Sequence, residues 1–367
     1  MLSLGKLAAG PDAGRYYEEA VARGREDYYA GEGEAPGRWV GAGAAMLGLR
    51  ATVEDGEVGH LLAGEDPASG ALLGRKITEG RVAGFDLTFK AQERRHLFGI
   101  GEAEIARVVR ECHDVAVDDA VGYLEREACR ARRGKDGVLQ VEGRGFVGAA
   151  FGHRTSRAGD PLLHTHVVVA NRTQGPDGRW TALDARVIYR HAKTAGYLYQ
   201  ARLRHEVTER LGLEWGEVRK GSADLAGFSR ELVEHFSQRR AEIVEELAQR
   251  GGNSLLAAQT AALATRKGKD YGVPIERLRE EWRARAAEHG LDREHCEELL
   301  ARRVAASRPE TIDLHALTRS ASTFTRRDVL QAVAATYRAG VTAIELEAEV
   351  DAGPGRPRGR AHRRSGR

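Results

Sequence analysis

The chain has 367 residues, 41% of them hydrophobic and 30% charged, which is the composition of a folded globular protein with one large domain or two ordinary ones. It contains no apolar run near the roughly 18–20 residues of a membrane span, no apolar signal core at its N-terminus, and only three scattered cysteines, which favours a cytoplasmic protein with reduced thiols. The net charge of +3 becomes −3 without the six arginines of residues 355–367, so overall charge does not by itself indicate a nucleic-acid partner.

The N-terminal part combines a helical stretch, a loop and a strand. Residues 1–40 open with glycine- and alanine-rich sequence, after which two tyrosine pairs stand on a largely helical background, and residues 53–81 are acidic and glycine-rich, as loops are. Residues 82–90 (VAGFDLTFK) alternate, with Asp86 and Thr88 on the polar side, which predicts a half-buried strand.

A helix and a hairpin follow, and the second half is helical. Residues 101–130 have the apolar spacing of a helix. Two β-prone runs, 141–153 and 162–173, are joined through Gly159 and Pro161, which favours an antiparallel hairpin. From residue 182 onward the apolar period is helical, so the residues predict an α/β layer followed by a helical region.

Three histidines are brought together by this hairpin. His164 and His166 are two residues apart, so on a strand both imidazoles share one face. In a regular hairpin His153 lies directly opposite His164. A histidine pair on a strand is also common as an ordinary surface feature, but the third imidazole favours a divalent metal site with open coordination positions. Nitrogen ligands alone do not choose between Mg²⁺, Mn²⁺ and Zn²⁺.

Other polar residues near this site have two interpretations each. Asp86 either orients a ligand imidazole or is an ordinary solvent-facing acid. The tyrosine pairs either pack on an amphipathic helix or supply a nucleophile, since a phenol with a pKa near 10 becomes useful beside a metal-activated phosphodiester. These pairs are Tyr16-Tyr17 and Tyr28-Tyr29.

Several segments together resemble one known family. RYYEEA, EDYYAGEGEAPGRWVG, GFDLTF, FGHRTSRAGDPLLHTHVVVANRTQGPDGRWTALDAR and LTRSASTFTRRDVL are similar to the relaxase domain of TrwC/TraI-type (MobF) conjugative relaxases, which are histidine-hydrophobe-histidine endonucleases. The resemblance covers most of residues 1–335. It implies an α+β fold: a two-layer palm with a five-stranded antiparallel β-sheet flanked by helices, plus a helical C-terminal region over single-stranded DNA.

The resemblance also implies an activity and a site. The activity is metal-dependent, strand-specific nicking at an origin of transfer by tyrosine transesterification, with a 5′-phosphotyrosine intermediate. Tyr16 matches the first nucleophile and Tyr28 the second, Tyr17 and Tyr29 their accessory partners, and Asp86 the acid that orients a triad histidine and accepts the tyrosine proton. The metal ligands are His153, His164 and His166. The implied partners are DNA and accessory conjugation proteins, and the expected state is a monomer.

The chain departs from the family pattern at two places. After GFDLTF the family continues close to APKSVSLLFG, whereas this chain reads KAQERRHLFG (90–99), as a compensated frameshift would produce. Arg94, Arg95 and His96 then replace an apolar run beside Asp86, where buried charge is destabilising. No GxxxxGK[ST] phosphate loop occurs, so no helicase or ATPase activity is expected of this chain.

The expected domain organisation follows from these segments. Residues 1–310 form the nicking domain, with the palm in 1–190 and a mainly helical part in 191–310; 311–350 begin a truncated helicase-type region, and 351–367 form a disordered basic tail.

Basic residues of the predicted hairpin and helices are either solvated or contact DNA phosphates. They are Arg154, Arg202, Arg204, Arg239, Arg240, Arg266, Lys267 and Lys269. Two alternatives to a relaxase remain: a catalytically impaired DNA-binding remnant, and an unrelated three-histidine oxygenase or hydrolase.

Overall fold

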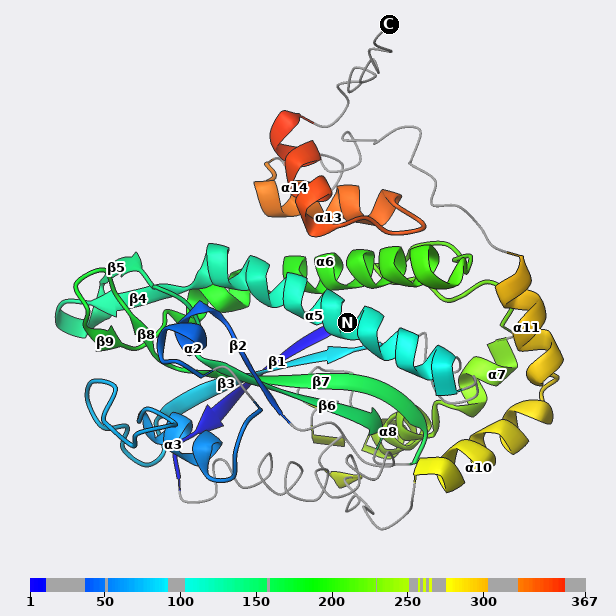
Figure 1. Cartoon of the computed structure of the whole chain (residues 1–367), viewed down its shortest axis with the longest axis horizontal. Coiled ribbons are helices and arrows are strands. Elements are labelled where there is room, and N and C mark those ends of the chain that lie inside the picture. The colour runs from blue at the N-terminus through cyan, green and yellow to red at the C-terminus, as the bar shows by residue number, and fades with distance from the viewer. Residues whose placement is uncertain are drawn as a thin grey trace, which may run out of the picture.

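The centre of the molecule is a five-stranded antiparallel sheet with the strand order β1-β3-β7-β6-β2 (Figure 1). The computed structural model describes residues 1–10, 37–49, 52–91, 103–156, 159–228, 230–250, 275–302 and 323–353, together with residues 257, 260–261 and 264–265. The strands of the sheet are β1 (Leu2–Ala8), β2 (Arg38–Val40), β3 (Val82–Lys90), β6 (Gly148–Thr155) and β7 (Pro161–Ala170). The predicted α+β palm is confirmed.

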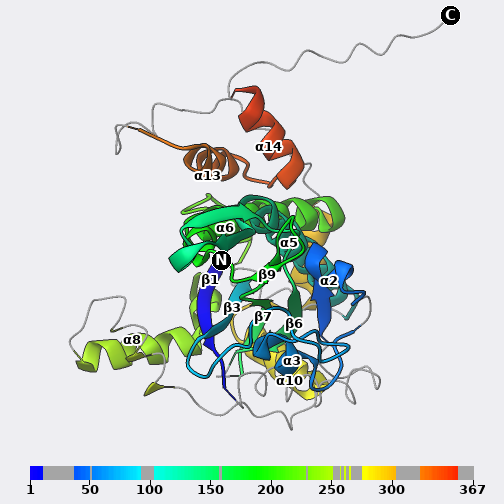
Figure 2. The same ribbon diagram turned by 90° about the vertical axis from the view of Figure 1, so that its left-hand side faces the viewer.

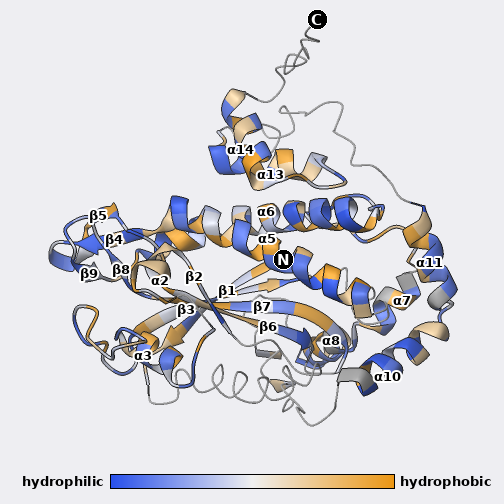
Figure 3. Ribbon diagram, in the orientation of Figure 1, coloured by the Kyte–Doolittle hydropathy of each residue, from blue (hydrophilic) through white to orange (hydrophobic). Residues whose placement is uncertain are grey.

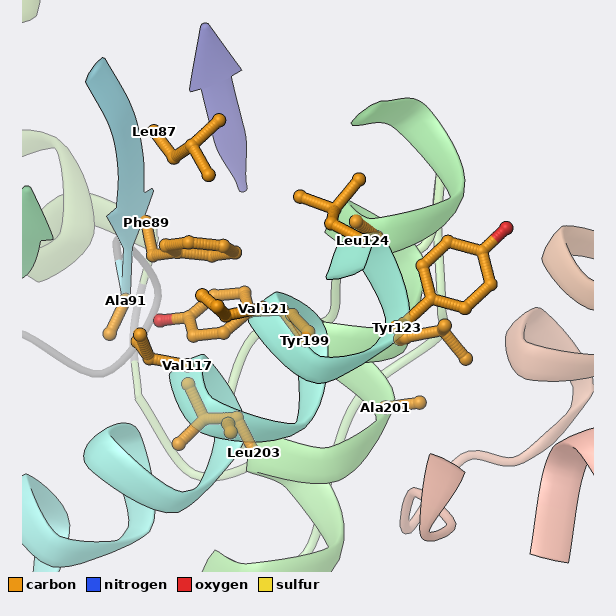
Figure 4. Packing of buried hydrophobic residues seen from close by; sticks show 14 of the residues in the cluster. Leu87, Phe89, Ala91, Val117, Val121, Tyr123, Leu124, Tyr199, Ala201 and Leu203 are labelled. Atoms are coloured by element: carbon orange, nitrogen blue, oxygen red, sulfur yellow. The ribbon is translucent and has the colours of Figure 1, made fainter. Parts of the chain in front are cut away.

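Two long helices cover one face of this sheet. Helices α5 (Ala103–Ala128) and α6 (Ala185–Leu211) lie side by side above it, as the end-on view in Figure 2 shows. The apolar side of β3, with Leu87 and Phe89, packs against buried side chains of both helices (Figure 4). Apolar residues are interspersed with polar ones along α5 and β3 in Figure 3, as expected for elements with one buried side.

A buried histidine ties both helices to the sheet. His113 of α5 is fully buried, and its Nδ1 and Nε2 atoms lie 2.8 Å from the Tyr199 hydroxyl of α6 and 2.8 Å from the Thr165 hydroxyl of β7, respectively. Each ring nitrogen therefore has a hydrogen-bond partner, which a buried imidazole requires. Thr165 is the residue between His164 and His166, so this bridge supports the strand that carries two of the three predicted ligands.

The opposite face of the sheet has its own smaller core. Helix α3 (Glu57–Ala63) packs Val58 and Leu62 against Phe151 and Val168 of the sheet. The expectation that residues 53–81 are entirely loop is wrong here, because a seven-residue helix fits between two glycines in the left-handed conformation, Gly56 and Gly64. Helix α2 (Ala42–Met46) follows β2.

Small hairpins extend the end of the α5–α6 layer. They are formed by β4 (Arg130–Arg133) with β5 (Leu139–Glu142), around the short 3-10 turn η2 (Lys135–Gly137), and by β8 (Thr173–Gln174) with β9 (Trp180–Thr181). Asp184 then caps the N-terminus of α6, accepting a hydrogen bond from the backbone N–H of Arg186.

The helical region lies at the turn of the β6–β7 hairpin. It contains α7 (Arg230–His235), α8 (Gln238–Arg250), α10 (Ile275–Ala287) and α11 (Arg293–Ala301). Asp160, 1% exposed, accepts hydrogen bonds from the backbone of Gln238 at 2.9 Å and from the Arg285 guanidinium at 3.1 Å. Trp282 Nε1 donates to the carbonyl of Gly159 at 2.9 Å. The hairpin turn is therefore fastened to this region by buried polar contacts.

A last pair of helices forms a third layer. Helices α13 (Arg326–Thr336) and α14 (Ala343–Ala352) pack on the outer side of α6 and share its hydrophobic core (Figure 1). Helix α14 includes Asp351 and Ala352, so the tail predicted at 351–367 begins two residues too early; residues 354–367 lie outside the described residues. None of the helices in the described part of the chain is long and apolar enough to cross a membrane.

Candidate metal centre

The hairpin register brings three imidazoles to one face of the sheet. His153 of β6 pairs directly with His164 of β7, as the hairpin spacing predicts, and His166 follows two residues later. Residues paired across antiparallel strands, and residues two apart along a strand, point to the same face. We call the face that carries these three histidines the histidine face; it is the face turned away from α5 and α6.

The three rings form a nearly equilateral triangle. Their centroids are separated by 5.2 Å for His153 and His164, 5.4 Å for His153 and His166, and 5.3 Å for His164 and His166. Three imidazoles that coordinate one ion through metal–nitrogen bonds of about 2.0–2.1 Å bring their centroids to roughly 5 Å from one another. The spacing of the rings therefore fits a shared ion.

Hydrogen bonds determine which nitrogen of two rings faces the centre. Nδ1 of His166 donates to the carboxylate of Asp86, with distances of 2.8 Å to Oδ2 and 3.0 Å to Oδ1. Nδ1 of His164 donates to the backbone carbonyl of Leu162 at 2.9 Å. Because a carboxylate and a carbonyl only accept, Nδ1 carries the proton in both rings, and Nε2 is the nitrogen with a lone pair for a metal.

Asp86 is itself held in place on β3. The Thr88 hydroxyl donates to its Oδ1 at 3.2 Å, and both side chains lie on the polar side of the strand, as the alternation predicts. The Asp86 and His166 side chains are 16% and 15% exposed, so their pair is largely removed from water. A carboxylate that orients a ligand imidazole is a common partner in metal sites.

The donor chemistry fits a divalent ion, but the cage is not complete in the described residues alone. In the described ranges, no group of three or more histidine, cysteine or acidic side chains is already arranged to hold a metal ion. The spacing of the three rings and the Nδ1 hydrogen bonds of His164 and His166 nevertheless agree with such a site.

Lys90 is a residue of this face to which the sequence prediction assigned no role. It is the last residue of β3, pairs with His164 across the strands, and is half-buried. Burial lowers the pKa of its ammonium group, and the nearby Asp86 carboxylate partly opposes that shift. The same alternation that places Asp86 and Thr88 on the polar side extends to Lys90 and could have identified it.

Three of the basic residues predicted to contact DNA, Arg154, Arg202 and Arg204, are buried or largely buried. Arg204 is fully buried, and its guanidinium donates to the carbonyls of Gly221, Ala334 and Tyr337. Its side chain is thus not available to a surface phosphate. Arg154 is 7% exposed, and Arg202, whose side chain is 20% exposed, forms ion pairs with acids of α5 and α6.

The remaining predicted site residues are not all placed by the structure. Arg239 and Arg240 belong to α8, but only their backbone is described. Four tyrosines, three basic residues and most of the altered segment lie outside the described residues: Tyr16, Tyr17, Tyr28, Tyr29, Arg266, Lys267, Lys269 and residues 92–99.

An antiparallel palm with three converging imidazoles and an orienting carboxylate defines the class of site, a candidate metal centre on an α+β fold. The chain belongs to the TrwC relaxase family, whose model matches residues 11–289. It is 35% identical over 306 residues to the multifunctional conjugation protein TraI of Escherichia coli, an alignment that covers 80% of this chain and 16% of TraI.

Solved structures of this family share the fold. A copper-bound structure of the conjugative relaxase TrwC in complex with oriT DNA has a TM-score of 0.69 and 35% identity, covering 80% of this chain and 99% of that one. A TrwC complex with a 27-mer DNA comprising the recognition hairpin and the cleavage site has a TM-score of 0.65 and 34% identity over the same shares. The chain spans 16–18% of the length of the curated TraI relatives it matches.

Proposed function

We propose that this chain is a conjugative relaxase that nicks single-stranded DNA at an origin of transfer by metal-dependent tyrosine transesterification. The observation that carries the proposal is the triangle of His153, His164 and His166, with Asp86 fixing the tautomer of one ring. Support comes from TrwC structures in complex with oriT DNA, one of which is copper-bound.

The three imidazoles would hold a divalent ion, Mg²⁺, Mn²⁺ or Zn²⁺, through their Nε2 atoms. Such an ion would withdraw charge from the non-bridging oxygens of the scissile phosphate. Within the protein, Asp86 keeps His166 in the tautomer with a proton on Nδ1, and the Leu162 carbonyl does so for His164. Both rings are therefore oriented before any ligand arrives, which removes an ordering cost from binding.

The nucleophile is assigned to Tyr16 by its match to the family motif. Its phenolic oxygen attacks the phosphorus, the bond from phosphorus to the 3′-oxygen breaks, and the phenolic proton ends on the 3′-hydroxyl or a nearby base. Because the phosphotyrosine retains the phosphodiester linkage, a free 3′-hydroxyl can reverse the step. Tyr28 serves a second cleavage, and Tyr17 and Tyr29 are accessory to the two nucleophiles.

The surroundings of Asp86 favour one of its two proposed roles. Its oxygens already accept hydrogen bonds from His166 and Thr88. A carboxylate with two donors is a weaker base than an isolated one. We therefore infer that Asp86 orients His166 and that removal of the tyrosine proton is the lesser part of its role.

Covalent capture of DNA tests this function. The protein is incubated with single-stranded oligonucleotides from the DNA flanking its gene and Mn²⁺, the adduct is digested with protease, and the modified tyrosine is located by mass spectrometry. We expect the nucleotide on Tyr16 and no adduct in Tyr16→Phe. Tyr189→Phe is the matched control, because Tyr189 contacts Lys6 on the α6 side of the sheet.

Each of the other outcomes supports a different function for this chain. DNA binding without adduct in the wild type identifies the impaired remnant, and neither binding nor adduct identifies an unrelated three-histidine metalloenzyme. An adduct on Tyr28 alone, or full activity of Tyr16→Phe, contradicts the assignment of the nucleophile.

A further inference from the structure

Lys90 brings a positive charge to the histidine face. The residue pairs with His164 across β3 and β7, and paired residues on adjacent antiparallel strands have Cβ atoms about 4.5–5.5 Å apart. Its backbone is fixed on the other side as well, since the Lys90 N–H donates to the Met1 carbonyl at 2.9 Å. The ammonium group is thus carried on a rigid strand end beside the metal ligands.

The position is unfavourable for a cation in the protein alone. Lys90 is half-buried, and burial lowers the pKa of its ammonium group. The acid that opposes this shift is Asp86, and its carboxylate is already engaged by His166. A divalent ion bound between the imidazoles would add further positive charge to the same face. Lysine side chains usually lie in solvent, so the half-buried position of Lys90 on the interior strand β3 requires a reason.

An anion on the histidine face removes this conflict. A phosphodiester strand carries one negative charge per nucleotide, and a lysine ammonium is a compact charge with three donors that suits a phosphate oxygen.

We propose that the Lys90 ammonium binds a non-bridging oxygen of a DNA phosphate next to the metal centre and so positions the strand for cleavage. The proposal rests on the proposed function and names a positioning residue for it. It involves no covalent step and no proton transfer. The alternative is that the lysine stem only covers apolar surface and its charge reaches water.

The test compares Lys90→Met, Lys90→Arg and Lys6→Met. Methionine retains the length of the stem without its charge, and arginine retains the charge. Lys6 is the matched control: a lysine of the same sheet whose Nζ lies 5.9 Å from the Tyr189 ring, on the face covered by α6. Single-strand affinity is measured by fluorescence anisotropy in EDTA over a range of salt concentrations, so that metal loading does not enter.

We expect Lys90→Met to bind DNA about 10-fold more weakly at low salt and to lose about 0.7 from the slope of log K against log[salt], the value for one phosphate contact. Lys90→Arg should retain the slope, and Lys6→Met should match the wild type. An unchanged slope in Lys90→Met overturns the proposal, as does an equal loss in Lys6→Met.

Failure of this inference is distinguishable from failure of the proposed function. If the wild-type protein forms the tyrosine adduct but Lys90→Met keeps the wild-type slope of log K against log[salt], only the role of Lys90 is contradicted. Wild-type protein that neither binds single-stranded DNA nor forms the adduct contradicts both. Calorimetric titration with Mn²⁺ without DNA provides a second readout: Lys90→Met should bind the ion at least as tightly as the wild type, and weaker binding would assign Lys90 to ligand geometry instead.

Discussion

Nδ1 of His166 on β7 lies 2.8 Å from Oδ2 of Asp86 on the neighbouring strand β3, and this pair fixes both the orientation and the tautomer of the ring. Replacing the acid should therefore affect metal binding before it affects folding. We expect Asp86→Ala to weaken binding of Mn²⁺ by about 10–100-fold, the usual effect of losing such a partner. Calorimetric titration measures the affinity, and thermal unfolding without metal shows whether the fold is retained.

Thr88→Val is the comparison for this pair, because the Thr88 hydroxyl lies 3.2 Å from Asp86 Oδ1 and 3.3 Å from His166 Nδ1, so both of its contacts are longer than the bond between the acid and the ring. Its effect should be smaller than that of Asp86→Ala. Wild-type affinity in Asp86→Ala would show that the carboxylate does not support the metal ligand.

Asp160 should hold the helical region against the hairpin. It is 1% exposed and accepts bonds from Gln238 of α8 and Arg285 of α10. Asp160→Ala leaves Arg285 without this acid, so we expect a loss of about 2–4 kcal/mol in the free energy of unfolding. Hydrogen exchange should increase in α8 and α10 and stay unchanged in α5.

A surface ion pair provides the comparison for Asp160. Arg250 pairs with Glu246 on α8 with its side chain 45% exposed, so Arg250→Ala should change stability by less than about 0.5 kcal/mol. If exchange in α8 and α10 is the same in Asp160→Ala and Arg250→Ala, the fastening role of Asp160 is wrong.

Arg204 should contribute to stability and not to DNA affinity. Its guanidinium donates to carbonyls of Gly221, Ala334 and Tyr337, and so joins α6 to the α13 segment. Arg204→Met removes the guanidinium donor from the Gly221 and Ala334 carbonyls and leaves the Tyr337 carbonyl with the backbone N–H of Gly340, so we expect the protein to lose about 2–4 kcal/mol of stability. The salt slope of DNA binding should stay at the wild-type value. If Arg204→Met instead lowers the DNA affinity and leaves the free energy of unfolding unchanged, Arg204 contacts DNA after all.

The N-cap of α6 should make part of the stability depend on pH. The hydrogen bond from the Arg186 side chain lowers the pKa of Asp184 to about 2, below the value of about 3.9 for an unfolded chain. A depressed carboxyl pKa stabilises the fold above the unfolded value, and the gain is lost as pH falls through the folded pKa. Asp184→Ala should therefore cost about 1–2 kcal/mol at pH 7 and progressively less from pH 4 to pH 2.

Denaturant unfolding of wild type and Asp184→Ala at pH 7, 4 and 2.5 measures this dependence. Asp177→Ala is a useful comparison, since the pKa of the exposed Asp177 carboxyl is also lowered, by Arg133, without a helix to cap. A difference between wild type and Asp184→Ala that does not change with pH would contradict the electrostatic account.

Much of the site could be predicted from local periodicity. The alternation of residues 82–90 gave the face of Asp86, and the centre of the hairpin turn gave the pairing of His153 with His164. Both depend on the two-residue repeat of a strand, which needs no knowledge of distant contacts. The face of Lys90 follows from the same repeat, but its burial does not.

Tertiary contacts between distant segments were beyond such reasoning. Arg204 lies in a helical pattern in which exposed and buried arginines look alike, and two of its three partners, Ala334 and Tyr337, are 130 and 133 residues away. Helix α3 is too short for its period to be recognised. The roles of the tyrosine pairs and the division of the chain at residue 310 stay predictions from the family resemblance.

The third layer determines on which side of the molecule helix α14 ends. Helices α13 and α14 are fastened to α5 and α6 by core packing and by ion pairs to α5, such as Arg126 with Glu347 and Glu127 with Arg326. The C-terminal end of α14, at Gly353, therefore lies on the far side of the α5–α6 layer from the imidazoles (Figure 2). A protein or label joined directly to Gly353 would therefore start on the opposite side of the α5–α6 layer from the three histidines. A fluorophore at that end should leave DNA entry unobstructed.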